Sequence, residues 1–147
     1  IEAVRSLVQA APPSDSTSVA AALMTVDVET FLRTPALHDE IFGPTSLIVR
    51  CSDTKDFMRC ARALEGQLTA TVWAEPHELK GQDEFLWTLE QRVGRLVFNG
   101  FPTGVEVGRA TVHGGPFPST TDSRFTSVGT RAFARFIRPV AYQNELT

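Results

Sequence analysis

The sequence has no apolar stretch long enough to cross a bilayer, and it has only two cysteines in 147 residues. A membrane-spanning helix needs about 18–20 consecutive apolar residues, and the first residues lack the charged-then-apolar plan of a signal peptide. Cys51 and Cys60 are too few for a disulfide-stabilised secreted scaffold of this length. These absences predict a soluble, cytoplasmic protein that has no membrane partner.

Positive charge is also scarce. The formal net charge of −3 argues against non-specific nucleic-acid binding, which requires lysines and arginines gathered on one face. The arginines near the C-terminus are spaced among phenylalanines, a pattern typical of a solvated face whose apolar positions turn inward. No second Cys or His pair offers zinc spacing. We therefore predict neither a nucleic-acid partner nor a metal site.

The first part of the chain contains short predicted elements separated by a loop. Ile1, Val4 and Val8 recur at the i, i+3 and i+7 spacing of a helix. A chain that begins without methionine and inside a helix is expected to be cut from a longer protein. The stretch from Pro12 to Ser18 predicts a loop or linker, followed by a strand over 20–26 and a short helix or turn over 28–32.

The next hundred residues alternate between strand and helix patterns. Strands are expected over 46–51, 68–74 and 95–98, and helices over 53–64 and 77–92. The first of these strands is a β-branched apolar run, which predicts burial on both faces. Ser52 or Asp53 is the expected cap of the first helix, and Gly66 and Gly94 are the expected stops of the two helices. This alternation predicts an α/β fold with βαβ units and a mostly parallel sheet.

A long connection rich in glycine and proline follows, from Asn99 to Thr126. Connections of this length are uncommon unless they are functional. In an open parallel sheet, ligands gather beyond the carboxyl ends of the strands, where this loop leaves its strand. A short helix is expected over 128–134. The last segment, 135–142, is expected to be an edge strand because Pro139 cannot donate to a ladder.

Three motifs resemble, in order and spacing, the C-terminal part of aldehyde dehydrogenases. They are Glu40-Ile41-Phe42-Gly43-Pro44; Leu64-Glu65-Gly66-Gln67-Leu68-Thr69-Ala70-Thr71-Val72, similar to the family's YGLAAAV strand; and Gly94-Arg95-Leu96-Val97-Phe98-Asn99, similar to its G-x-V-x-V-N. The resemblance runs from about Ala36 to the C-terminus. It implies that Glu40 holds the nicotinamide-ribose hydroxyls of NAD or NADP and that Phe42 packs near the nicotinamide ring. Composition alone would make them a surface glutamate and a core phenylalanine.

Two further segments resemble one branch of that family, the 2,5-dioxovalerate or α-ketoglutaric semialdehyde dehydrogenases. They are Val97-Phe98-Asn99-Gly100-Phe101-Pro102-Thr103-Gly104-Val105-Glu106-Val107 and His113-Gly114-Gly115-Pro116-Phe117-Pro118-Ser119-Thr120. The resemblance implies an enzyme that oxidises 2-oxoglutarate semialdehyde to 2-oxoglutarate. The wider family has PFGG-x-K-x-SG-x-G near Pro116. The lysine is missing here, so only Phe117 carries over.

The resemblance also implies which residues contact the aldehyde substrate. These are Phe101, Pro102, Thr103, Val105 and Phe117. For each of them, simple packing within a turn-rich loop is an open alternative. His113, which lies beside two glycines, is expected to serve loop packing instead of acting as a general base or an anion site.

The reacting groups of the family are not expected in this chain. The family's nucleophilic cysteine lies in an F-x-x-x-G-Q-x-C setting about a hundred residues before the Glu40 motif, and only 39 residues precede Glu40 here. Cys51 and Cys60 lack that setting and are expected to be small apolar packing residues. The water-activating glutamate and the dinucleotide-binding half are also missing. We therefore expect no catalytic residue, no activity and no tightly bound cofactor without the missing N-terminal part of the enzyme.

Two segments follow from this interpretation. Residues 1–134 are expected to be an incomplete part of the catalytic domain, and residues 135–147 an oligomerisation strand and tail. In the family the last strand pairs with a neighbouring subunit, which implies a homo-oligomer. The alternative is a naturally short, non-catalytic binding or assembly module derived from this fold. The choice between NAD and NADP and the range of aldehydes stay open.

Overall fold

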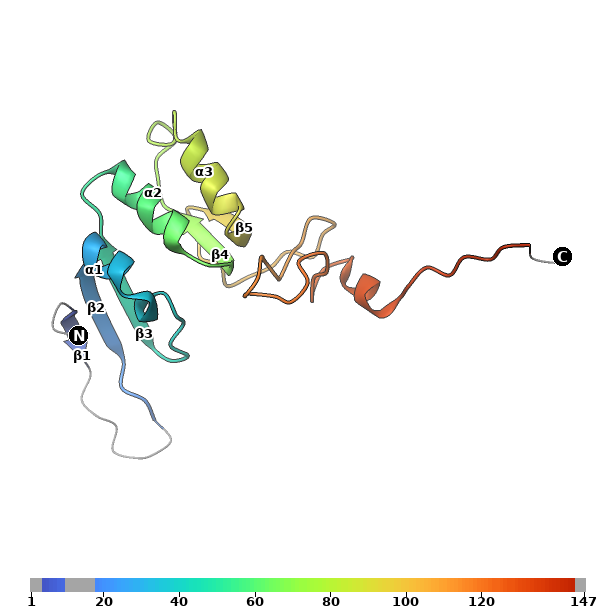
Figure 1. Ribbon diagram of the computed structural model, residues 1–147, viewed down its shortest axis with the longest axis horizontal. Coiled ribbons are helices and arrows are strands. Elements are labelled where there is room, and N and C mark those ends of the chain that lie inside the picture. The colour runs from blue at the N-terminus through green and yellow to red at the C-terminus, as the bar shows by residue number, and fades with distance from the viewer. Residues whose placement is uncertain (1–3, 10–17, 145–147) are drawn as a thin grey trace. The chain divides into compact units, whose positions relative to one another are not determined.

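The computed structural model describes residues 4–9 and 18–144 (Figure 1). The chain forms two compact units, Ile1–Leu64 and Glu65–Thr147. Each unit has a sheet of its own, with three strands in the first and two in the second.

The first unit is a three-stranded sheet accompanied by helices. Its elements are β1 (Arg5–Gln9), β2 (Ala22–Asp27), α1 (Val28–Arg33), the 3₁₀ helix η1 (Pro35–Leu37), β3 (Thr45–Arg50) and α2 (Thr54–Ala63). The strand order is β1-β2-β3, with β1 antiparallel and β3 parallel to β2. The β2–α1–β3 segment is therefore a βαβ unit. Its buried apolar side chains come from β2, α1 and α2, namely Val26, Val28, Phe31 and Ala61.

Two expectations for this unit were wrong. The helix at the start is the strand β1, although Ile1 itself lies outside the described residues, as does most of the Pro12 to Ser18 breaker. The expected burial of β3 on both faces is also not found, because its residues alternate between half-buried and exposed. In the described part of the chain, α1 packs on β2 and β3, and the other side of β3 carries the exposed Ser46, Ile48 and Arg50.

The N-terminal cap of α2 was predicted correctly, but the residue expected to stop the helix was not. Asp53 Oδ1 accepts a hydrogen bond from Asp56 N at 3.0 Å, which satisfies one of the free N–H groups of the first turn. The helix ends at Ala63, and its C-cap Leu64 has a φ of −68° and a ψ of 140°, which are those of extended backbone. Gly66 is therefore not a left-handed stop, because the helix has already ended.

The second unit contains a βαβ unit followed by the long connection. Its elements are β4 (Gln67–Val72), α3 (Asp83–Glu90), β5 (Val93–Phe98) and the 3₁₀ helix η2 (Ala132–Phe136). Strands β4 and β5 are parallel, which confirms the α/β prediction for this part. The helix expected over 77–92 begins only at Asp83. The residues before it form a turn instead, in which Glu75 N donates a hydrogen bond to Glu78 Oε2 at 2.7 Å and Gly81 has a φ of 78°.

Close backbone contacts explain the glycines at the amino ends of β4 and β5. A Cβ on Gly94 would overlap the carbonyl oxygen of Gly114, and a Cβ on Gly66 would overlap those of Pro116 and Phe117. Gly94 is therefore not a helix stop but a strand residue against which the connection packs. The connection leaves β5 at its carboxyl end and returns to the amino ends of both strands. Only the first part of the connection lies at the carboxyl edge of the sheet, where the sequence predicts a ligand.

The C-terminal part also differs from the prediction. The expected helix over 128–134 is the later 3₁₀ helix η2, which follows Gly129 at a φ of 85°. The expected edge strand over 135–142 is not confirmed, since no residue from 137 to 144 is in a strand. A strand needs a ladder partner, and none of the described residues pairs with this segment.

We predict that Gly94→Ala destabilises the second unit by about 1–3 kcal/mol, because the new methyl group displaces packed backbone. Urea unfolding followed by tryptophan fluorescence measures this unit, since both tryptophans, Trp73 and Trp87, belong to it. The matched control is Gly104→Ala, where a Cβ meets no atom within 4 Å. A midpoint for Gly94→Ala equal to that of the control would contradict the close packing.

Candidate functional site

The Glu40 motif lies on the segment that enters β3 and is tied down at both ends. At its start, His38 Nε2 bonds Phe31 O at 2.9 Å, and the His38 ring lies over the Phe31 ring with 4.2 Å between centroids. At its end, Ala22 N donates to Pro44 O at 3.0 Å, which extends the β2–β3 ladder. Sequence reasoning missed His38, because a histidine seven residues after a buried phenylalanine gives little signal.

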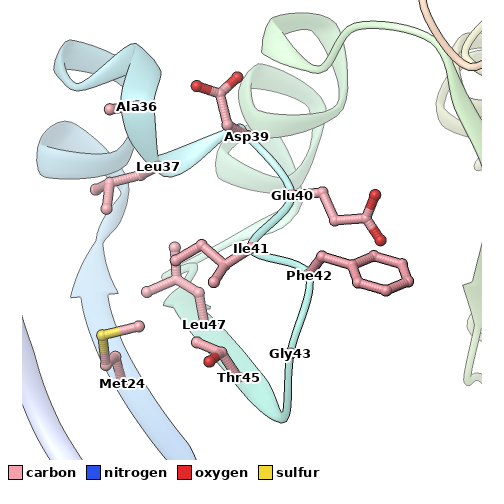
Figure 2. A pocket seen from close by; sticks show the side chains of 10 residues that line it. All are labelled: Met24, Ala36, Leu37, Asp39, Glu40, Ile41, Phe42, Gly43, Thr45 and Leu47. Atoms are coloured by element: carbon pink, nitrogen blue, oxygen red, sulfur yellow. The ribbon is translucent and has the colours of Figure 1, made fainter. Parts of the chain in front are cut away.

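Side chains along this segment alternate between two sides (Figure 2). Ile41 points toward Leu47 and Met24 of the sheet, and these residues line an open hollow of about 650 Å³. Glu40 and Phe42 both point to the other side of the segment, and they too line the hollow (Figure 2). The alternation is what extended backbone produces.

Glu40 and Phe42 do not pack in the core of the first unit. Phe42 is 98% exposed, so the alternative of a core phenylalanine at a strand entry is wrong. Glu40 is exposed, and in the described part of the chain no hydrogen bond or ion pair reaches its carboxylate. Two carboxylate oxygens can accept bonds from two neighbouring hydroxyl groups, and the phenylalanine beside them offers an apolar face. The pair fits a ribose and an adjoining planar ring.

The predicted substrate residues after β5 lie in the other unit, at the carboxyl end of its sheet. Asn99 fixes the start of this loop with a φ of 49°, and its side-chain amide bonds Ala74 at both N (3.0 Å) and O (2.9 Å). Phe101 is 78% exposed and lies edge-on to Trp73 with 5.5 Å between centroids. Pro102 and Gly104 are held by Arg95.

Phe117 does not join these residues. Its carbonyl oxygen packs on Gly66, just before the first residue of β4, while Phe101 lies beyond the carboxyl ends of the strands. The Phe117 ring is 79% exposed. His113 lies in the same returning part, where Thr126 Oγ1 accepts from His113 N at 2.9 Å. The structure therefore brings together the predicted contacts at 101–103 and separates Phe117 from them.

The two cysteines are neighbours in the first unit. Cys51 follows β3 and Cys60 lies on α2, and both thiols are half-buried. Burial raises the pKa of Cys51, and it raises the pKa of Cys60 to about 11. Both groups are therefore held as thiols at neutral pH, the less nucleophilic form.

Two other kinds of site are absent from the part of the chain that the structure describes. In residues 4–9 and 18–144, no helix is long and apolar enough to span a membrane. In the same ranges, no three His, Cys, Asp or Glu residues come together as metal ligands.

Curated proteins with similar sequences give the family. Protein-family profiles have no match to the chain. The chain is 51% identical over 123 residues to alpha-ketoglutaric semialdehyde dehydrogenase 2 of Azospirillum brasilense, a match that covers 84% of the chain and 23% of that protein. It is 53% identical over 110 residues to alpha-ketoglutaric semialdehyde dehydrogenase of Acinetobacter baylyi, covering 75% of the chain and 21% of that protein. The chain thus spans less than a quarter of the length of these relatives. By sequence it belongs with the aldehyde dehydrogenases and matches the C-terminal part of the α-ketoglutaric semialdehyde branch.

Proposed function

We propose that this chain serves an enzyme that oxidises α-ketoglutaric semialdehyde to 2-oxoglutarate with NAD⁺ or NADP⁺. The observation that carries the proposal is the identity of 51–53% to two dehydrogenases named for this substrate. The exposed Glu40 and Phe42, which line one hollow and have no role in the core, support it from the structure.

In this proposal Glu40 and Phe42 would orient the nicotinamide cofactor, which would supply the hydride acceptor for the aldehyde oxidation. The Glu40 carboxylate accepts hydrogen bonds from the two ribose hydroxyls, and Phe42 packs against the adjoining ring. Neither residue makes or breaks a bond. Their contribution is to hold the ring at one distance and angle, which is a large part of the barrier reduction in reactions between two bound molecules.

The loop after β5 contributes to the substrate channel in this proposal. Phe101, Pro102, Thr103 and Val105 present apolar atoms to the methylene groups of the substrate. Thr103 adds a hydroxyl that can bond a substrate oxygen. Phe117 remains a proposed contact, but its place at the amino ends of the strands gives it less support.

The nucleophile is supplied by another part of the enzyme. In this proposal a cysteine thiolate would add to the aldehyde carbon, and the adduct would become a thioester when it gives up its hydride to NAD(P)⁺. Water would then hydrolyse the thioester to the acid and the free thiol. Cys51 and Cys60 are unsuited to this role because burial raises the pKa of both thiols. The chain alone is accordingly expected to produce no NAD(P)H from the semialdehyde.

The C-terminal segment is proposed to contact a neighbouring subunit of a homo-oligomer. Its large apolar side chains are exposed, namely Phe136, Ile137, Val140 and Tyr142. An extended segment whose backbone groups have no ladder partner can add to the edge of another sheet. Its exposed side chains would be covered by the same contact.

Replacing Glu40 by glutamine in the full-length enzyme is expected to lower turnover by about tenfold to a hundredfold. The variant removes the negative charge from a hydrogen bond that contributes about 1.5–3 kcal/mol. Steady-state kinetics with the semialdehyde measure the change.

The matched control is Asp39→Asn, which neutralises the adjacent exposed acid that points away from Glu40 and Phe42 (Figure 2). Its turnover should equal that of the wild type. Unchanged turnover and cofactor affinity in Glu40→Gln would remove Glu40 from cofactor binding. An inactive wild-type enzyme would remove the proposed function itself.

The cysteines are expected to react slowly with iodoacetamide at neutral pH. With the pKa of Cys60 raised to about 11, the rate should rise about tenfold per pH unit from pH 7 to pH 10, because only the thiolate reacts. Mass spectrometry of the modified peptides gives the rate for each cysteine, with glutathione as the reference thiol. A rate that levels off near pH 7 would identify an activated nucleophile and contradict our assignment.

Removal of residues 137–147 from the full-length enzyme is expected to reduce its oligomeric state, because the exposed apolar segment is lost. Light scattering after size-exclusion chromatography measures the mass. A shorter deletion of residues 144–147 serves as the control and should leave the assembly unchanged. Equal masses for the wild type and the long deletion would rule out this segment as the contact.

A further inference from the structure

Arg95 of β5 binds the proposed substrate loop with both ends of its guanidinium group. Nη2 donates to Pro102 O and Nη1 donates to Gly104 O, each at 2.7 Å. The two acceptors stand on either side of Thr103. One side chain therefore holds both flanks of a residue proposed to contact the substrate.

The loop has little else to fix its shape. In the described part of the chain, no other hydrogen bond reaches residues 100–105. Gly104 has open space around it, since a Cβ added there would have no atom within 4 Å. The root of the loop is fixed separately by Asn99. Between this root and residue 105, the two Arg95 bonds are the polar contacts that define the path of the backbone.

The identity of the side chain suits this task. An arginine presents its donors in a rigid planar fork, so two acceptors are bonded at once in a fixed relation. A lysine ammonium is a single flexible point of charge and cannot reproduce that spacing. Arg95 Nε is buried without a hydrogen-bond partner in the structure. An arginine that leaves a buried donor unpaired costs stability, which argues against a role in stability alone.

We propose that Arg95 is a positioning residue that sets the shape of the loop 100–105 and thereby the fit of the aldehyde. The claim about the loop shape concerns this chain by itself. The claim about the fit of the aldehyde rests on the proposed function. Arg95 acts through the loop and does not touch the reacting atoms.

The loop shape is tested on the chain by NMR. The contact between the rings of Trp73 and Phe101 should give a cross-peak between their protons in the wild type. In Arg95→Gln this cross-peak should be lost, while the signals of Trp87 on α3 stay unchanged and show that the unit is folded. Arg95→Lys, which keeps the charge and the aliphatic stem, should give a weakened cross-peak. Arg50→Gln, an exposed strand arginine of the first unit, is the matched control.

The substrate effect is tested on the full-length enzyme. Arg95→Gln should lower kcat/KM for the semialdehyde by about tenfold to a hundredfold, the usual effect of a small misplacement. The KM for the cofactor should not change, because Glu40 and Phe42 belong to the other unit. Arg95→Lys should fall between the wild type and Arg95→Gln.

The outcomes separate the two proposals. A cross-peak that persists in Arg95→Gln overturns the positioning role. A lost cross-peak with unchanged kcat/KM overturns the link from the loop to the substrate and leaves the proposed function intact. A wild-type enzyme that does not oxidise the semialdehyde overturns the proposed function, and the cross-peak then decides the positioning role alone.

Discussion

Parallel strand pairing determines where both candidate sites lie. A parallel neighbour cannot be reached by a tight turn, so the chain must cross over and enter the next strand at the same edge. In the first unit this places the Glu40 segment directly before β3, where Ala22 N bonds Pro44 O and continues the ladder. In the second unit the same pairing aligns the ends of β4 and β5, so that Asn99 reaches Ala74. Without these ladders, neither segment would have a fixed position.

The pattern of the sequence was sufficient where local rules decide the structure. The βαβ order and the Asp53 cap depend on neighbours in the chain, and both were predicted. The first strand was not, because eight residues with a helical spacing can also form a strand with a register shift, such as the one between Ser6 and Val8. The burial of β3 and the packing of Gly94 depend on segments that are distant in the sequence. The spacing of apolar residues within one segment carries no information about such contacts.

The candidate site was predictable to the extent that its motifs resemble a known family. Glu40 and Phe42 carry no distinguishing local signal, and their exposure came only from the structure. Arg95 was overlooked because one charge in an apolar strand is commonly taken as a solvent-facing position. Its half-buried location and its reach back to Pro102 follow from the turn at Asn99, whose positive φ is rare for residues other than glycine.

Asn99 has a consequence for how freely the loop after β5 can vary. Its side-chain amide bonds both backbone groups of Ala74, so a side chain takes the place that the next peptide of the strand would fill. The backbone can then turn away while the last rung of the sheet stays paired. The pairing of the strands therefore does not depend on the path of the loop. Insertions or substitutions beyond residue 99 can therefore reshape the loop without disturbing the strands.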